Sequence, residues 1–135
     1  MKFALRNNIM RNYQNYEVWG EAHRVVLLIY NEIAPRIPRI EQFGITSQMK
    51  RAACSVPLNI AEGCGRNSEN EFVHFLDISL GSAHELEYCL LLAKDLGYLE
   101  IDLYDQLNRK VNSIKAMLIN LIKLIRLQGT KGLRP

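Results

Sequence analysis

Glu71 and His74 form the single Glu-x-x-His string in the chain, a pattern that supplies ligands in di-iron helical bundles. Such a site takes a second Glu-x-x-His from another helix, and the sequence has none. His23 and His84 also lack a histidine four residues further on. Glu71 already has a structural role, because Ser68-Glu-Asn-Glu71 is a capping box that begins a helix. We therefore expect neither a metal site nor a cofactor site.

The three cysteines, Cys54, Cys64 and Cys89, are the other side chains with the chemistry of a nucleophile. They lack CxxC spacing, and no base lies beside them in the sequence, so a distant histidine is the one remaining activator. We expect reduced, buried thiols. The chain also lacks a P-loop and a glycine-rich dinucleotide motif, because Glu62-Gly-Cys-Gly65 closes a helix instead of opening one after a strand. These features favour a protein that is not an enzyme.

Polar side chains of mixed chemistry recur every three or four residues between positions 44 and 66. They are Gln48, Arg51, Ser55, Asn59, Glu62 and Arg66, and we call them the polar arc. At about 100° per residue they share one side of a helix, next to an apolar face. Their donors and acceptors can satisfy one another, which predicts a structural polar network inside the bundle or across a subunit contact. In that network Glu62 pairs with Arg51 or Arg66. The alternative is a polar channel or ligand pocket at an oligomer axis.

The C-terminal third of the chain is basic. From Gln106 onward there are seven lysines and arginines and no acid, whereas Asn67 to Asp105 hold nine acids and one base. The predicted nucleic-acid-binding residues are Lys110, Lys115, Lys123 and Arg126, with Lys131 and Arg134 beyond them. Neutralised phosphates suffice for weak, sequence-tolerant binding to RNA or DNA, and no aromatic residues alternate with these cations to stack on bases. The alternatives are a solvated face, or cations neutralised by the acidic helix that precedes them.

Four helices must position these side chains. Hydrophobic periodicity predicts them over residues 15–34, 44–65, 68–96 and 103–127, with no strand pattern. Pro57 lies inside the second helix, so that either one helix kinks there or two helices meet, and the unbroken apolar spacing favours a kink. The predicted fold is all-α, an antiparallel up-down-up-down four-helix bundle over residues 15–127. Residues 1–14 are expected to form an N-terminal arm and residues 128–135 a flexible C-terminal tail.

The third and fourth helices have distinct contact surfaces. An apolar seam with alternating four- and three-residue steps follows the third helix: Phe72, Leu76, Ser79, Ala83, Leu86, Leu90 and Ala93. Its small residues should let the second helix approach closely; they are Ser79, Gly81, Ser82 and Ala83. The fourth helix has the seam Leu107, Val111, Ile114, Leu118, Leu121 and Ile125, and a surplus of Met117, Ile119, Ile122 and Leu124. A surplus that a monomer would expose predicts a homo-oligomer.

Length and composition agree with a single globular domain. The chain has 135 residues, of which 48% are hydrophobic and 23% charged, with a net charge of +3. This is enough chain to bury a core without metals or disulfides. No apolar stretch reaches the ~20 residues of a membrane span, and the first residues lack the apolar centre of a signal peptide. The expected location is the cytoplasm.

The motifs in the second and third helices resemble a known family. Gly44-Ile-Thr-Ser-Gln48, Asn59-Ile-Ala-Glu-Gly63 and Gly81-Ser82 with Glu85-Leu86-Glu87 are similar to the bacterial four-helix bundles first noticed in intervening sequences of 23S ribosomal RNA genes. The resemblance extends over roughly residues 16–125. It implies a four-helix bundle and a homopentamer. One relative, the accessory protein of diversity-generating retroelements, binds nucleic acid and a reverse transcriptase.

The combined expectation is a non-enzymatic oligomeric scaffold that binds nucleic acid, or a protein partner acting on it, through a basic surface. The alternative is a protein–protein interaction module with no nucleic-acid role, whose charge asymmetry serves self-assembly alone.

Overall fold

The chain forms four long helices in the computed structural model, which describes residues 11–132, with side chains through residue 129. They are α2 (Glu17–Leu28), α3 (Ile45–Cys64), α4 (Glu69–Asp95) and α5 (Ile101–Gly132). A π-helical segment, Ile29–Ile33, extends α2, and short 3-10 turns lie at Tyr13–Asn15, Ala34–Arg36 and Arg39–Glu41. No strand occurs in this part of the chain. The predicted all-α four-helix bundle is therefore confirmed.

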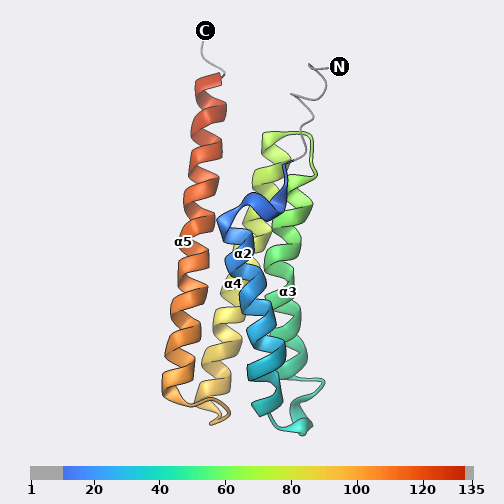
Figure 1. The fold of residues 1–135 in the computed structure, drawn as a ribbon, viewed down its shortest axis with the longest axis vertical. Helices are drawn as coiled ribbons and strands as arrows, with labels where there is room; N and C mark the ends of the chain where they lie inside the picture. The colour runs from blue at the N-terminus through green and yellow to red at the C-terminus, as the bar shows by residue number, and fades with distance from the viewer. Residues whose placement is uncertain (1–10, 133–135) are drawn as a thin grey trace.

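Successive helices run in opposite directions. Figure 1 shows the chain passing down α2, up α3, down α4 and up α5. α4 packs against both α3 and α5, and α2 packs against α3 and α5 on the other side of the core. The core between them is made mainly of aliphatic side chains, with Phe72 as its buried aromatic ring. No helix in the described residues is long and apolar enough to cross a membrane.

α3 continues through Pro57 as one helix, so the alternative of two helices meeting there is wrong. The predicted kink itself stays a prediction. Close packing against α4 supports this segment, because the buried Ser79 hydroxyl donates to the Val56 carbonyl at 2.8 Å. Gly63 belongs to the last turn of α3, where an added Cβ would lie 3.0 Å from atoms of both Phe72 and Phe75. The missing side chain at Gly63 lets α4 come this close.

α4 follows its sequence pattern closely. All seven seam residues are buried, and the Ser68 hydroxyl accepts the Glu71 amide at 3.1 Å, which is one half of the predicted capping box. Ser79, Ser82 and Ala83 lie in the interior, whereas Gly81 is exposed with open space around it and takes no part in the close approach. Gly97 ends α4 with φ of +83°, a conformation that glycine adopts at little cost.

α5 departs from its predicted seam in the second half. Ile122, assigned to the surplus, is 4% exposed and belongs to the core, while Leu121 is only half-buried. Leu121 and Ile122 lie at opposite edges of the apolar face, because successive residues are about 100° apart around a helix, and the bundle covers the edge with Ile122 before the seam returns to Ile125. The helix also continues to Gly132, past the predicted end at Leu127. Most of the predicted N-terminal arm, and the last residues of the predicted tail, lie outside the described residues.

Candidate functional site

The polar arc forms a ladder of pairs along α3. Arg51 Nη2 donates to Gln48 Oε1 at 2.8 Å, and Asn59 Nδ2 donates to Ser55 Oγ at 2.9 Å and to the Ser55 carbonyl at 2.8 Å. Each partner lies three or four residues away, which is the spacing at which helix side chains meet. Residues of the polar arc therefore serve as hydrogen-bond partners for one another.

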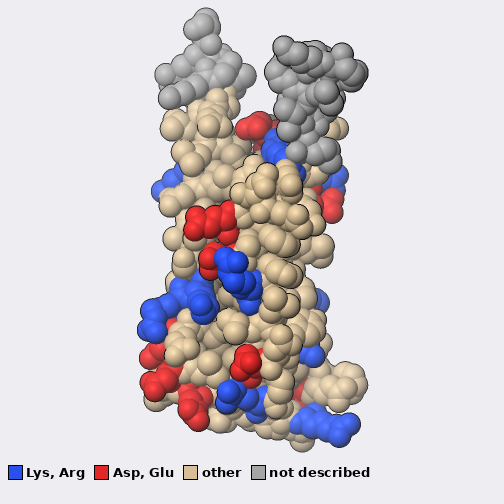
Figure 2. All heavy atoms as spheres, viewed as in Figure 1, with Lys and Arg blue, Asp and Glu red and all other residues tan. Residues whose placement is uncertain are grey.

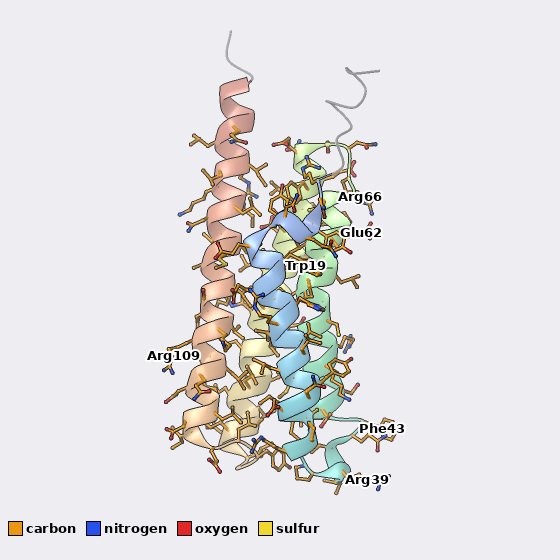
Figure 3. The ribbon with its side chains drawn as sticks, in the orientation of Figure 1. Trp19, Arg39, Phe43, Glu62, Arg66 and Arg109 are labelled. Atoms are coloured by element: carbon orange, nitrogen blue, oxygen red, sulfur yellow. The ribbon has the colours of Figure 1, made fainter. Side chains whose placement is uncertain are left out.

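Glu62 pairs with Arg66, at 2.6 Å, and not with Arg51. Figure 3 shows both side chains on the outer side of α3. The Glu62 side chain is 48% exposed and that of Arg66 is 40% exposed, so this end of the polar arc lies at the surface of the single chain. The prediction that the network lies inside the bundle is therefore wrong for Glu62 and Arg66. A position across a subunit contact, or around an oligomer axis, stays a prediction.

The middle of the polar arc connects α3 to α4. Ser55 Oγ and Ser82 Oγ share a hydrogen bond of 2.7 Å, and both Ser55 and Asn59 are half-buried. Ser55 thereby bonds to a neighbouring helix and to Asn59 at once. This hydrogen bond favours one register of α3 against α4, a role that the sequence analysis did not assign to the polar arc.

Next to the polar arc lies a groove between α3 and α4, with a volume of about 580 Å³. On the α3 side it is lined by Gln48, Arg51 and Ser55, and on the α4 side mainly by Glu85, Tyr88, Leu92 and Leu96. We call this the α3–α4 groove. Sequence reasoning found its polar wall but missed its apolar one, because Tyr88 and Leu96 fall outside the buried seam of α4.

The predicted nucleic-acid-binding residues divide into two pairs. Lys115 Nζ lies 2.7 Å from Glu87 Oε1, and Arg126 Nη2 lies 3.4 Å from Asp77 Oδ2, so α4 offsets both cations. The hydrogen bond from Lys115 holds the pKa of the Glu87 carboxyl below its ordinary value. Lys110 and Lys123 are exposed and make no ion pair with the described residues. Lys131 and Arg134 lie outside the residues whose side chains are described.

The visible surface has no continuous basic band. Figure 2 shows patches of Lys and Arg separated by patches of Asp and Glu along the bundle. Arg109 points away from α5 into solvent in Figure 3, beside the exposed Lys110 in sequence. On this face, the cations of the acid-free run do not form one dense patch.

The sequence analysis did not identify a second group of cations. Arg36, Arg39 and Lys50 line a depression of about 640 Å³ at the α2–α3 connector, together with the ring of Tyr30. Lys50 Nζ lies 4.8 Å from the centroid of that ring. Aromatic and basic side chains therefore meet at the connector, as they also do where Lys94 Nζ lies 4.8 Å from the ring centroid of Tyr104 on α5. Two prolines separate these residues in the sequence, and their irregular spacing gave no periodic signal.

In the described residues, no three histidine, cysteine, aspartate or glutamate side chains gather closely enough to hold a metal ion. Glu71 lies 4.0 Å from Arg66, and His74 packs edge-on against Phe75. Burial raises the pKa of the Cys64 thiol to about 11 and also raises that of Cys89, which keeps both thiols protonated and poorly nucleophilic at neutral pH.

Comparison with known proteins places this bundle in a family. The model of the 23S rRNA-intervening sequence protein family matches residues 14–120. No curated protein matches the chain. A solved structure is similar: a Bacteroides thetaiotaomicron protein with unknown function from the S23 ribosomal protein family. Its TM-score is 0.73 and its sequence identity 27%, over 78% of this chain and 95% of that one. The chain belongs to the 23S rRNA-intervening sequence protein family.

Proposed function

We propose that this chain is a subunit of a non-enzymatic homo-oligomeric scaffold. The observation that carries the proposal is the number of large apolar side chains left outside a completed core. Ile40 and Phe43 are each 89% exposed, Leu58 is 65% exposed, and Leu124 and Leu127 are more than half exposed. Apolar surface in this amount favours association with another protein surface. The resemblance to homopentameric relatives supports a ring of five subunits.

Mass measurement tests the assembly. In sedimentation equilibrium at micromolar concentration, we expect a species several times the chain mass of 15.5 kDa, and five times that mass for a pentamer. A single species of 15.5 kDa over the whole concentration range would contradict the scaffold proposal.

The proposed task of the scaffold is to hold nucleic acid, or a partner that processes it. The observations that favour this are the unpaired, exposed Lys110 and Lys123 on α5 and the acid-free stretch around them. Each phosphate neutralised on a single strand adds about 0.7 to the slope of log affinity against log salt. An oligomer repeats the same contacts around its axis, so weak sites add up to useful affinity.

A matched pair of variants tests nucleic-acid binding. We expect a short unstructured oligonucleotide to bind the wild type at low salt and to bind Lys110→Gln/Lys123→Gln more weakly. Lys115→Gln is the control, because Glu87 already offsets its charge. Fluorescence anisotropy at two salt concentrations gives both the affinities and the salt slope. No binding at low salt would contradict this part of the proposal.

The pairing of Lys115 and Arg126 with acids on α4 favours the second candidate function. In this candidate the charges serve the bundle and its assembly, and the protein is an interaction module with no nucleic-acid role. An oligomer that fails to bind the oligonucleotide at low salt would select it.

A further inference from the structure

The α2–α3 connector holds two apolar side chains in solvent. Ile40 and Phe43 are each 89% exposed, and Figure 3 shows Phe43 and Arg39 pointing away from the bundle. We call the segment from Arg39 to Phe43 the connector knob. A free loop of this composition would fold back onto nearby apolar surface. This one does not.

Several contacts hold the connector knob in place. The Tyr98 hydroxyl donates to Glu41 Oε2 at 2.9 Å, and the Gly44 amide donates to the Glu41 carbonyl at 2.9 Å. Just before the knob, Ile37 is 7% exposed and anchors the segment to the core. Side chains presented by an ordered segment lose little conformational freedom on binding. The knob therefore presents its apolar side chains from an ordered backbone, which favours binding.

The α3–α4 groove offers the complementary surface. Its α4 wall includes Tyr88, which is 60% exposed, and Leu96, which is 49% exposed, with Leu92 between them. Its volume of about 580 Å³ gives room for more than one apolar side chain. On the α3 wall, Arg51 is a cation over which an aromatic ring can pack.

The charges of the two surfaces are also complementary. Arg39 in the connector knob and Glu85 in the groove wall are both exposed, and neither makes an ion pair with the described residues. An arginine and a carboxylate of this kind favour each other across an interface and fix its orientation.

We propose that the connector knob of one copy inserts Ile40 and Phe43 into the α3–α4 groove of a second copy, with Arg39 beside Glu85. This inference rests on the proposed self-assembly and names its contact. Glu41 belongs to both surfaces, but their other residues differ, so the contact is heterologous, and heterologous contacts generate rings when the rotation closes.

The positions of the two surfaces suit a ring. The groove begins at Glu41 in the connector, continues past Ile45 in the first turn of α3, and reaches Leu96 just after α4, which is the bundle end that carries the connector. Figure 1 shows these segments together at the lower end. A rotation about an axis parallel to the helices keeps every surface at its own height. The knob of one copy therefore meets the groove of the next without any shift along the axis.

The apolar part of the contact is tested by sedimentation equilibrium. We expect Ile40→Ser/Phe43→Ser to weaken self-association by roughly tenfold or more, because buried anchor side chains dominate interfaces. Helix content should not change, since neither side chain supports the fold. Leu27→Ser is the matched control, an exposed leucine on α2 outside the groove, and it should keep wild-type association. Equal weakening by both variants would overturn the proposed contact.

The charged part is tested by exchange of the two charges. Arg39→Glu alone and Glu85→Arg alone should each weaken association, and the double variant should restore it towards the wild type. A double variant that is no tighter than the weaker single variant would overturn the contact. An oligomer that survives all the knob variants unchanged would exclude this contact and leave the scaffold proposal standing. A wild type that is monomeric throughout would exclude both.

Discussion

α3 and α5 both pack against α4, but they do so with different chemistry. The buried residues of α5 in the described part of the chain are leucine, isoleucine and valine alone. α3 buries several small residues, Ala52, Ala53 and Gly63 among them, and exchanges hydrogen bonds with Ser79 and Ser82 of α4. Interdigitated aliphatic side chains tolerate adjustment, whereas a close approach with fixed hydrogen-bond partners allows one register. The difference indicates that α3 and α4 set the alignment of the bundle and that α5 contributes mainly buried area.

The largest effect should come from removing aliphatic volume on the α5 side. Leu118 is 0% exposed, so Leu118→Ala should lower the free energy of unfolding by about 2–5 kcal/mol through lost burial and the cavity left behind. Leu127→Ala is the control, because Leu127 is 54% exposed. Urea denaturation followed by circular dichroism measures both. Comparable losses for the two variants would show that α5 does not contribute through its core face.

The close approach of α3 and α4 should reject even small added groups. Gly63→Leu should cost about 1–3 kcal/mol, because the new side chain would press on Phe72 and Phe75. Gly81→Ala, in open space on α4, should instead stabilise the protein by up to about 1 kcal/mol through helix propensity. Opposite signs in thermal melts of these two glycine variants would confirm the contrast. A gain in stability for Gly63→Leu would refute it.

A smaller effect is expected for the hydrogen bond across the same contact. Ser79→Ala removes the donor to the Val56 carbonyl and should cost about 1 kcal/mol. The measured free energy of unfolding should therefore fall less than for Leu118→Ala. A loss as large as that of Leu118→Ala would mean that this hydrogen bond between α3 and α4 contributes as much to stability as the buried volume of Leu118.

The smallest effect concerns the ion pair between α4 and α5. The pKa of Glu87 is lowered by its bond to Lys115, so its contribution is fully present above the unfolded pKa of about 4.3 and is lost as the pH falls through the lower folded value. At pH 7, Glu87→Gln should cost about 1 kcal/mol or less, since the pair is partly exposed. The difference from the wild type should vanish near pH 2. A difference that persists there would assign the effect to packing.

The sequence predicted those elements whose pattern is local. The seam of α4 holds at all seven positions because a capping box and a regular repeat fix its phase. Ile122 was misplaced because it and Leu121 lie at opposite edges of the apolar face of α5, and the spacing alone does not tell which edge the other helices cover.

Features that depend on how the helices align were harder to predict. Lys115 and Glu87 are 28 positions apart, and their pairing follows from the register of α5 on α4. The exposure of Glu62 depends on which other helices extend as far as the end of α3. The periodicity of α3 alone does not give this information. Phe43 and Arg39 lie in a segment without a repeat, where only the three-dimensional structure shows what points outward.

The unequal lengths of the helices have a consequence for local opening. α2 begins at Glu17 beside Met117 and Leu121 of α5, and Figure 1 shows α5 continuing beyond it. The final turns of α5 therefore have fewer neighbours, and Ile125 is the last residue with a buried side chain in the described part. Amide hydrogens after Ile125 should exchange with solvent deuterium through local fraying, well before those near Leu118. Protection that stayed uniform along α5 would require another surface to cover this end in solution.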